Sequence, residues 1–160
     1  MDGRPLDRIE QLFQEGRQAE ALDLLKQEAF NNPSAPPAHF NLANAYARLG
    51  QWDLAIAGWL KSLALDPNLP AVLHNLALIH QKRGDAKQAI SYWERLLVLH
   101  PKSEEAHLSL AALFCQQGSY LEAENLLLRL EQLNPKHHLA LNNLGIIYRQ
   151  LKQTARAISA

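Results

Sequence analysis

The sequence predicts an all-α fold, an α–α superhelix in which antiparallel helix pairs stack one on the next. A related string of residues begins at Asn41, Asn75, Ser109 and Asn143, a constant step of 34 residues. Apolar residues follow helical spacing, and no segment shows the period of two that is typical of strands. A fixed period of this length indicates a repeat protein, whose units bury their apolar faces by stacking.

Three residue columns keep this period and predict where helices end. Glycine is expected to end each first helix, because a left-handed C-cap favours a residue without a Cβ. Proline is expected to follow each second helix, because it cannot continue one. Each unit is therefore predicted as helix, turn, helix, turn. The columns are Gly16, Gly50, Gly84 and Gly118; Pro33, Pro67, Pro101 and Pro135; and Ala21, Ala55, Ala89, Ala123 and Ala157.

Side chains that cap helices predict several helix starts. Ser103 is expected to cap the helix that follows it, with acidic residues in its first turn. Ser119 with Glu122 predicts a capping box for a second helix, and Asp85 with Gln88 is a looser version of the same pattern.

Composition excludes several classes of partner. Sixteen basic and sixteen acidic residues cancel, and 48% of the residues are hydrophobic. This composition is globular, and no net field attracts nucleic acid or an anionic membrane. We therefore expect neither nucleic acid nor membrane as a partner.

Cysteine usage and the N-terminus bear on location. Cys115 is the single cysteine, so the chain forms no internal disulfide and no cysteine-based zinc site. The N-terminal residues lack the apolar stretch of a signal peptide, and no apolar run is long enough to span a bilayer. If Met1 is the natural start, we expect a cytoplasmic protein.

The columns together resemble the tetratricopeptide repeat (TPR) family, whose pattern is W-x2-L-G-x2-Y, then A-x3-F, then P. The best match runs His39-x2-Leu42-Ala43-x2-Tyr46, then Ala55-x3-Trp59, then Pro67. The resemblance implies a right-handed solenoid and a non-catalytic interaction scaffold. We predict one domain over residues 1–160, with repeats at 2–35 (degenerate), 36–69, 70–103, 104–137 and 138–160 (truncated).

The last repeat departs from the pattern, because Lys152 stands where the column glycine is expected. We expect this repeat to stop partway through its second helix, so that Ala157 and Ile158 face no following helix. An exposed apolar edge of this kind predicts self-association through the C-terminal end.

A column of small residues is expected where the two helices of each repeat cross. Short side chains let two helix backbones approach closely, and a larger residue there would overpack the crossing. The predicted column is Ala43, Ala77, Ala111 and Gly145.

The resemblance places a concave groove along the first helices, read by side chains that point away from the second helices. Such a groove predicts a protein or peptide partner. Helical spacing selects the groove residues as Phe40, Asn41, Asn44 and Arg48; then His74, Asn75, Leu78 and Lys82; then Leu108, Ser109, Ala112, Cys115 and Gln116; and finally Asn142, Asn143, Ile146, Arg149 and Gln150.

Asn41, Asn75 and Asn143 form a recurring column that is interrupted at Ser109. An asparagine amide offers the acceptor and donors that match a peptide backbone. The column resembles the asparagine ladder in the repeat arm of O-linked N-acetylglucosamine transferases, which holds peptide backbones. The alternative is structural: each asparagine bonds to an adjacent helix and sets the pitch of the stack.

A carboxylate clamp, the acidic-tail site of co-chaperone TPR proteins, is not expected, because Phe40 and Leu108 stand where it needs cations. The seven histidines include no His-x3-His pair, so we predict no metal and no cofactor. No phosphate loop or nucleophile elbow is present, and Cys115 is expected to be an ordinary thiol. The predicted function is a scaffold that binds a peptide. The alternative is the substrate-recruiting arm of a longer enzyme, such as a glycosyltransferase.

Overall fold

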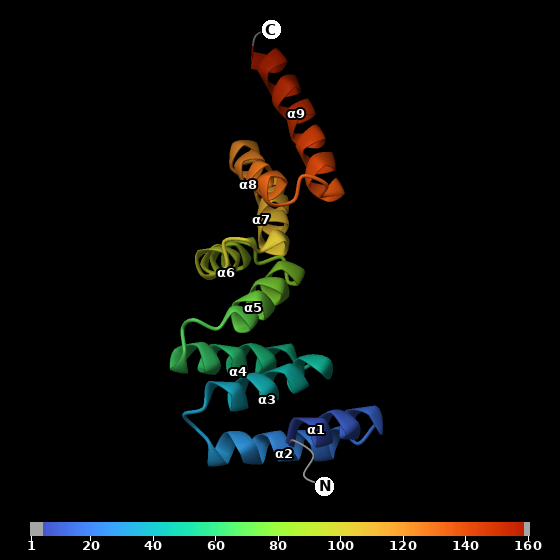
Figure 1. The fold of residues 1–160 in the computed structure, drawn as a ribbon, viewed down its shortest axis with the longest axis vertical. Helices are drawn as coiled ribbons and strands as arrows, with labels where there is room; N and C mark the ends of the chain where they lie inside the picture. Colours follow the sequence, from blue (N-terminus) through green and yellow to red (C-terminus); the bar gives the residue numbers. More distant parts are fainter. Residues whose placement is uncertain (1–4, 159–160) are drawn as a thin grey trace. The chain divides into compact units, whose positions relative to one another are not determined.

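The structure is a computed structural model that describes residues 5–158 (Figure 1). Within this range the chain forms nine helices and no strands, so the predicted all-α class is confirmed. The helices are α1 (Pro5–Gln14), α2 (Gln18–Asn31), α3 (Pro36–Arg48), α4 (Trp52–Leu65), α5 (Pro70–Lys82), α6 (Ala86–Leu99), α7 (Glu104–Gln116), α8 (Tyr120–Leu133) and α9 (His138–Ile158).

The chain divides into two compact units, residues 1–72 and 73–160. In the first unit, α2 packs against both α1 and α3, and α3 packs against α4. In the second unit, α7 packs against α6 and α8, and α9 packs against α8. Each unit is therefore built from helix pairs joined by short turns, the arrangement that the 34-residue period predicts.

The turns follow the glycine and proline columns. Gly16, Gly50, Gly84 and Gly118 each follow a first helix with φ between 72° and 77°, and no other described residue has a positive φ. A side chain with a Cβ is strained in this conformation, which explains the glycines. Each column proline stands two residues after the end of α2, α4, α6 or α8.

Two of the predicted caps form and one does not. The Ser103 hydroxyl accepts a hydrogen bond from the Ala106 backbone N–H at 3.3 Å, and the Asp85 carboxylate accepts one from Gln88 at 3.4 Å. Ser119 stands at the N-cap of α8 but accepts no capping hydrogen bond. The prediction of a capping box at Ser119 is therefore wrong.

Each unit has its own apolar core. In the first unit, side chains of α1, α2 and α3 meet, and Leu12 and Leu25 at its centre are fully buried. In the second unit, Ala111 of α7, Leu127 and Leu130 of α8, and Ile147 of α9 are equally buried. Because each core draws on helices of adjacent repeats, stacking is what removes these side chains from water.

The helix crossing in the second repeat is tighter than the sequence indicated. Ala43 is fully buried, and a Cβ added to Gly58 on α4 would lie 2.8 Å from the Ala43 Cβ. Gly58 therefore permits the close approach of α3 and α4, although it was not among the predicted crossing residues. Gly145 was predicted at a crossing, but a Cβ there would meet no described atom within 4 Å. That prediction is wrong.

The final helix also differs from the prediction. α9 runs without a break from His138 to Ile158, passing through Lys152 instead of turning there. The other first helices end before a glycine that adopts a positive φ, and lysine lacks that freedom. The predicted second helix of the last repeat therefore does not begin. The side chains of Ala157 and Ile158 lie outside the described residues.

Candidate functional site

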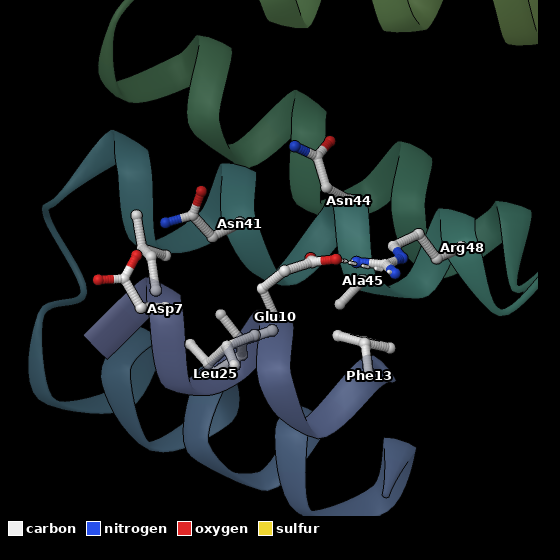
Figure 2. Close-up of a pocket in the computed structure, with 10 residues that line it drawn as sticks. Asp7, Glu10, Phe13, Leu25, Asn41, Asn44, Ala45 and Arg48 are labelled. Carbon is white, nitrogen blue, oxygen red and sulfur yellow. Dashed lines mark hydrogen bonds and ion pairs between the residues drawn. The ribbon is translucent and has the colours of Figure 1, made fainter. Parts of the chain in front are cut away.

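A cavity of about 480 Å³ opens between α1 and α3 in the first unit (Figure 2). Both helices are the first helices of their repeats, so the cavity lies on the face predicted to form the groove. Its lining mixes carboxylates, amides, a guanidinium and apolar side chains: Leu6, Asp7, Ile9, Glu10, Phe13, Leu25, Asn41, Asn44, Ala45 and Arg48.

Arg48 and Glu10 connect the two walls of the cavity. The Arg48 guanidinium donates to the Glu10 carboxylate at 2.6 Å, and it also lies over the Phe13 ring, 4.3 Å from the ring centre. Figure 2 shows the Glu10 side chain reaching from α1 toward Arg48 on α3. An exposed ion pair contributes about 0–1 kcal/mol, and the ring contact adds a similar amount. Together they favour the conformation in which the Arg48 guanidinium faces α1.

The remaining charge in the cavity is negative. Asp7 makes no ion pair within residues 5–158, whereas Glu10 and Arg48 neutralise each other. One net negative charge therefore remains on the lining, which disfavours an acidic ligand and favours a neutral or basic one.

Asn44 is held by a neighbouring tryptophan. Its side-chain oxygen accepts a hydrogen bond from the Trp59 indole N–H at 2.9 Å, and Trp59 is almost completely buried. This contact reaches from α3 to the second helix of the same repeat. Asn44 therefore has a structural role within its own repeat, and it also lines the cavity.

Seven of the ten lining residues were not predicted as groove residues, and five of these seven belong to α1. Leu6, Asp7 and Glu10 stand 34 residues before Phe40, Asn41 and Asn44, so they occupy the same columns one repeat earlier. The 34-residue period is therefore the feature of the sequence from which these α1 residues can be predicted to line the groove. Because the packing residues of the first repeat depart from the pattern, the sequence predicts a degenerate repeat there and assigns it no groove residues.

In the second unit, the predicted groove residue His74 contacts other side chains. Its Nε2 donates to the Glu105 carboxylate at 2.9 Å, which connects α5 to α7. Its ring stands edge-on to Trp93, with 5.3 Å between ring centres, and its Nδ1 lies 3.4 Å from the Asn75 side-chain oxygen. The sequence predicts acidic residues in the first turn of α7, but it does not predict the contact of Glu105 with His74 of the preceding repeat.

The other predicted groove residues fall into exposed and half-buried sets. Lys82, Asn142 and Ile146 are exposed. Phe40, Leu78, Leu108, Ser109, Ala112 and Asn143 are half-buried, and Leu108 packs against the core of the second unit. The cavity between α1 and α3 brings together three of the predicted residues: Asn41, Asn44 and Arg48.

Neither the histidines nor the cysteine indicate a metal or a nucleophile. The buried His39 donates through Nε2 to the Pro33 carbonyl oxygen at 2.8 Å, a helix-packing role. Within residues 5–158, no group of three or more potential ligands is arranged to hold a metal ion. Partial burial raises the pKa of the Cys115 thiol, which lowers the fraction of reactive thiolate. No helix in the described range has the length and apolarity needed to cross a membrane.

Comparisons with known proteins agree with the repeat pattern. The pattern of the family described as "TPR repeat" matches residues 44–84, and that described as "Tetratricopeptide repeat" matches residues 74–132 and 113–160. No curated protein matches the sequence.

Solved structures of low sequence identity share the fold. MamA (41 to end) from Desulfovibrio magneticus RS-1 is 19% identical with a TM-score of 0.77, the match covering 97% of this chain and 88% of that one. YrrB, described as a TPR protein with an unusual peptide-binding site, is 20% identical with a TM-score of 0.77, covering 92% and 76%. A tetratricopeptide repeat protein from Parabacteroides merdae is 20% identical with a TM-score of 0.83, covering 93% and 59%.

The period, the helix pairs and the turn glycines of this chain thus coincide with a family pattern that matches more than half of its residues. The chain belongs to the tetratricopeptide repeat family.

Proposed function

We propose that this protein is an interaction scaffold that binds an extended peptide along its first helices, with an anchoring side chain in the cavity between α1 and α3. One observation carries the proposal: Asn41 and Asn44 on α3 meet Asp7 and Glu10, their column counterparts on α1, around a single cavity. Two adjacent repeats therefore present the same columns to one ligand. YrrB, which shares the fold, is itself described as having a peptide-binding site.

The spacing of the repeats suits an extended chain. Packed helices lie about 8–10 Å apart, and an extended peptide rises about 3.3 Å per residue, so each repeat meets roughly every third residue. In this proposal the Asn41 amide bonds the peptide backbone, because it offers both a donor and an acceptor. Asn41 is half-buried at the rim of the cavity.

The cavity selects the anchoring side chain by its charge and its walls. Asp7 and Glu10 offer carboxylates, and Leu6 and Phe13 offer apolar surface. A lysine or arginine side chain has an apolar stem and a cationic end, so it fits this combination better than an acidic residue. We therefore expect peptides with a basic anchor. The carboxylate-clamp ligand, an acidic tail, is disfavoured by the same charges.

The experiment begins with a random peptide library displayed on phage and selected against the immobilised protein. The selected peptides are then synthesised and their affinities measured by calorimetry. Asp7→Asn keeps the size of the side chain and removes its charge, and Asn41→Ala removes the amide. Each is expected to weaken binding at least about tenfold, as for the loss of one polar contact in a desolvated site.

Asn125→Ala provides the matched control, because Asn125 is exposed on α8, a second helix. It is expected to leave peptide affinity unchanged. Peptides that bind Asp7→Asn and Asn41→Ala as tightly as the parent protein would refute the assignment of this cavity. For the asparagine column, loss of affinity in Asn75→Ala with unchanged stability favours a ligand role, and loss of stability alone favours the structural role.

Self-association through the C-terminal end is a further part of the proposal. The described part of α9 exposes the apolar side chains Leu139, Leu141, Ile146 and Tyr148. Light scattering over a dilution series tests this prediction, and a constant monomer mass would contradict it. The cytoplasmic location, the lack of catalysis and the resemblance to the transferase arm stay predictions, and no finding favours the arm of an enzyme over a scaffold.

A further inference from the structure

A second cavity, of about 310 Å³, lies within the second unit and away from the predicted groove residues. It is formed where the C-terminal parts of two second helices, α6 and α8, meet the start of α7. Its lining is Leu97, Pro101, His107, Arg129, Gln132 and Leu133. None of these side chains belongs to the proposed peptide groove, so this cavity is an independent feature.

His107 presents an unused acceptor to this cavity. The residue is only 3% exposed, and its Nδ1 donates to the Ser103 carbonyl oxygen at 2.8 Å. A neutral ring that carries its proton on Nδ1 has an acceptor at Nε2. In the described part of the chain Nε2 has no hydrogen-bond partner, and every fully buried side-chain nitrogen or oxygen there has one. Nε2 therefore keeps a small accessible surface, and the cavity that His107 lines is the space that we assign to it.

Comparison with the equivalent histidine supports this orientation. His39 stands 68 residues, or two repeats, earlier in the same column and is also buried. It uses the other nitrogen, Nε2, to donate to a backbone carbonyl of the preceding turn. The two imidazole rings therefore have different orientations. In the orientation of His107, Nδ1 makes the hydrogen bond to the backbone and Nε2 makes none.

Arg129 supplies the positive charge of the cavity. It is exposed on α8 and forms no ion pair with any residue in the described range. Gln132, one helical turn further along, adds an amide that also has no partner among these residues. Leu97, Pro101 and Leu133 complete the walls with apolar surface. The lining thus combines a guanidinium, an acceptor and an apolar wall.

We infer that this cavity binds a carboxylate with an adjacent amide N–H and an apolar side chain, the chemistry of an N-acylated apolar amino acid or of the last residue of a polypeptide. Arg129 pairs with the carboxylate, His107 Nε2 accepts the amide N–H, and Leu97 and Leu133 contact the side chain. The volume lies at the lower end of the range of about 300–1,000 Å³ for ligand sites, so it admits one residue and not a longer segment.

The test is an NMR titration of the isotopically labelled protein with N-acetyl-leucine. We expect saturable shifts confined to amides near His107 and Arg129, with a Kd on the order of 1 mM, as for a ligand of this size. N-acetyl-leucinamide has the same side chain but no carboxylate, and it is expected to bind at least about tenfold more weakly. Equal affinity for the acid and the amide would overturn the inference.

Arg129→Gln is the decisive variant. It removes the positive charge, and it preserves the helix because glutamine has a helix propensity similar to that of arginine. We expect it to weaken N-acetyl-leucine binding at least about tenfold. Arg8→Gln is the matched control, since Arg8 is exposed on α1 and does not line the cavity. If both variants bind like the parent protein, Arg129 does not hold the carboxylate and the inference fails.

His107→Asn separates the two roles of the histidine. The asparagine amide can replace the Nδ1 donor to Ser103, but it lacks Nε2. We expect weaker binding of N-acetyl-leucine and unchanged binding of isocaproate, which has the carboxylate and the apolar chain but no amide N–H. Equal loss for both ligands would contradict the role of Nε2. A thermal melt checks folding, and the Arg129 result stands without this variant.

A short peptide ending in leucine with a free carboxylate distinguishes the two sources of this chemistry. Binding at least about tenfold tighter than N-acetyl-leucine assigns the site to a polypeptide terminus, because further residues then contribute contacts. Equal affinity assigns it to a free acylated amino acid.

Discussion

Replacing Gly58 by alanine tests the close approach of α3 and α4. The added Cβ would lie 2.8 Å from the Cβ of Ala43 and 3.4 Å from its Cα, and both atoms are fixed to the backbone of α3. No side chain can rotate away, so the two helices must separate. Overpacking of this kind costs about 1–3 kcal/mol.

The higher helix propensity of alanine has the opposite effect on the stability of this variant. Alanine in the middle of a helix is about 1 kcal/mol more favourable than glycine. Gly58→Ala is therefore expected to lower the free energy of unfolding by about 0–2 kcal/mol, the difference between crowding and propensity. Gly145→Ala gains the same propensity, but its Cβ meets no described atom within 4 Å, so it should stabilise the protein by about 1 kcal/mol.

The assay is thermal or urea unfolding followed by far-UV circular dichroism for both variants. The difference between the two variants in the free energy of unfolding isolates the cost of crowding, because both variants gain the same helix propensity. A cost of about 1–3 kcal/mol corresponds to a Tm difference of several degrees. Adding Ala43→Gly to the Gly58 variant removes the facing methyl group, so a double-mutant cycle should recover this amount as coupling energy. Equal stabilisation by Gly58→Ala and Gly145→Ala would refute the reasoning.

Three further predictions concern single side chains. Asn44→Ala should lower the free energy of unfolding by about 1–3 kcal/mol, because it leaves the buried Trp59 N–H unpaired. Asn41→Ala should change the free energy of unfolding by less than about 0.5 kcal/mol. Equal effects of the two variants in urea unfolding would contradict this prediction. Because burial raises the pKa of Cys115, less thiolate forms at a given pH, and iodoacetamide at pH about 8 should alkylate the folded protein more slowly than the urea-unfolded one; equal rates would count against it. Lys152→Gly should speed amide hydrogen exchange around residue 152 of α9, because glycine costs about 1 kcal/mol in a helix interior; unchanged exchange would show that this segment does not depend on helix propensity.

Features set by local chemistry could be predicted from the sequence. The turns after α1, α3, α5 and α7 need a positive φ, and the glycine column identifies them without reference to distant residues. The same holds for the Ser103 cap, which bonds three residues away. The continuous α9 follows from the same rule, because the column lacks its glycine at Lys152, although a second helix was predicted to begin after that position.

Features set by contacts between repeats were harder to predict. The His74–Glu105 contact joins residues that are 31 positions apart, and neither residue recurs at its column position in the other repeats. Gly58 lies outside the recurring columns, so only the distance to Ala43 reveals its role. In the first repeat the packing residues diverge, and Asp7 and Glu10 stand where the next repeat has asparagines, so residue type alone does not identify them as groove residues.

The two buried tryptophans make the protein suitable for optical measurements on each unit separately. The Trp59 indole bonds Asn44 at the rim of the first cavity, and Trp93 bonds Gln81 of α5 in the second unit while lying against His74. Trp52, the third tryptophan, is 40% exposed and would add a background signal that phenylalanine at that position removes. A further Trp93→Phe change leaves Trp59 as the reporter of ligand at Asn44, and a further Trp59→Phe change leaves Trp93 as the reporter of its contact with His74.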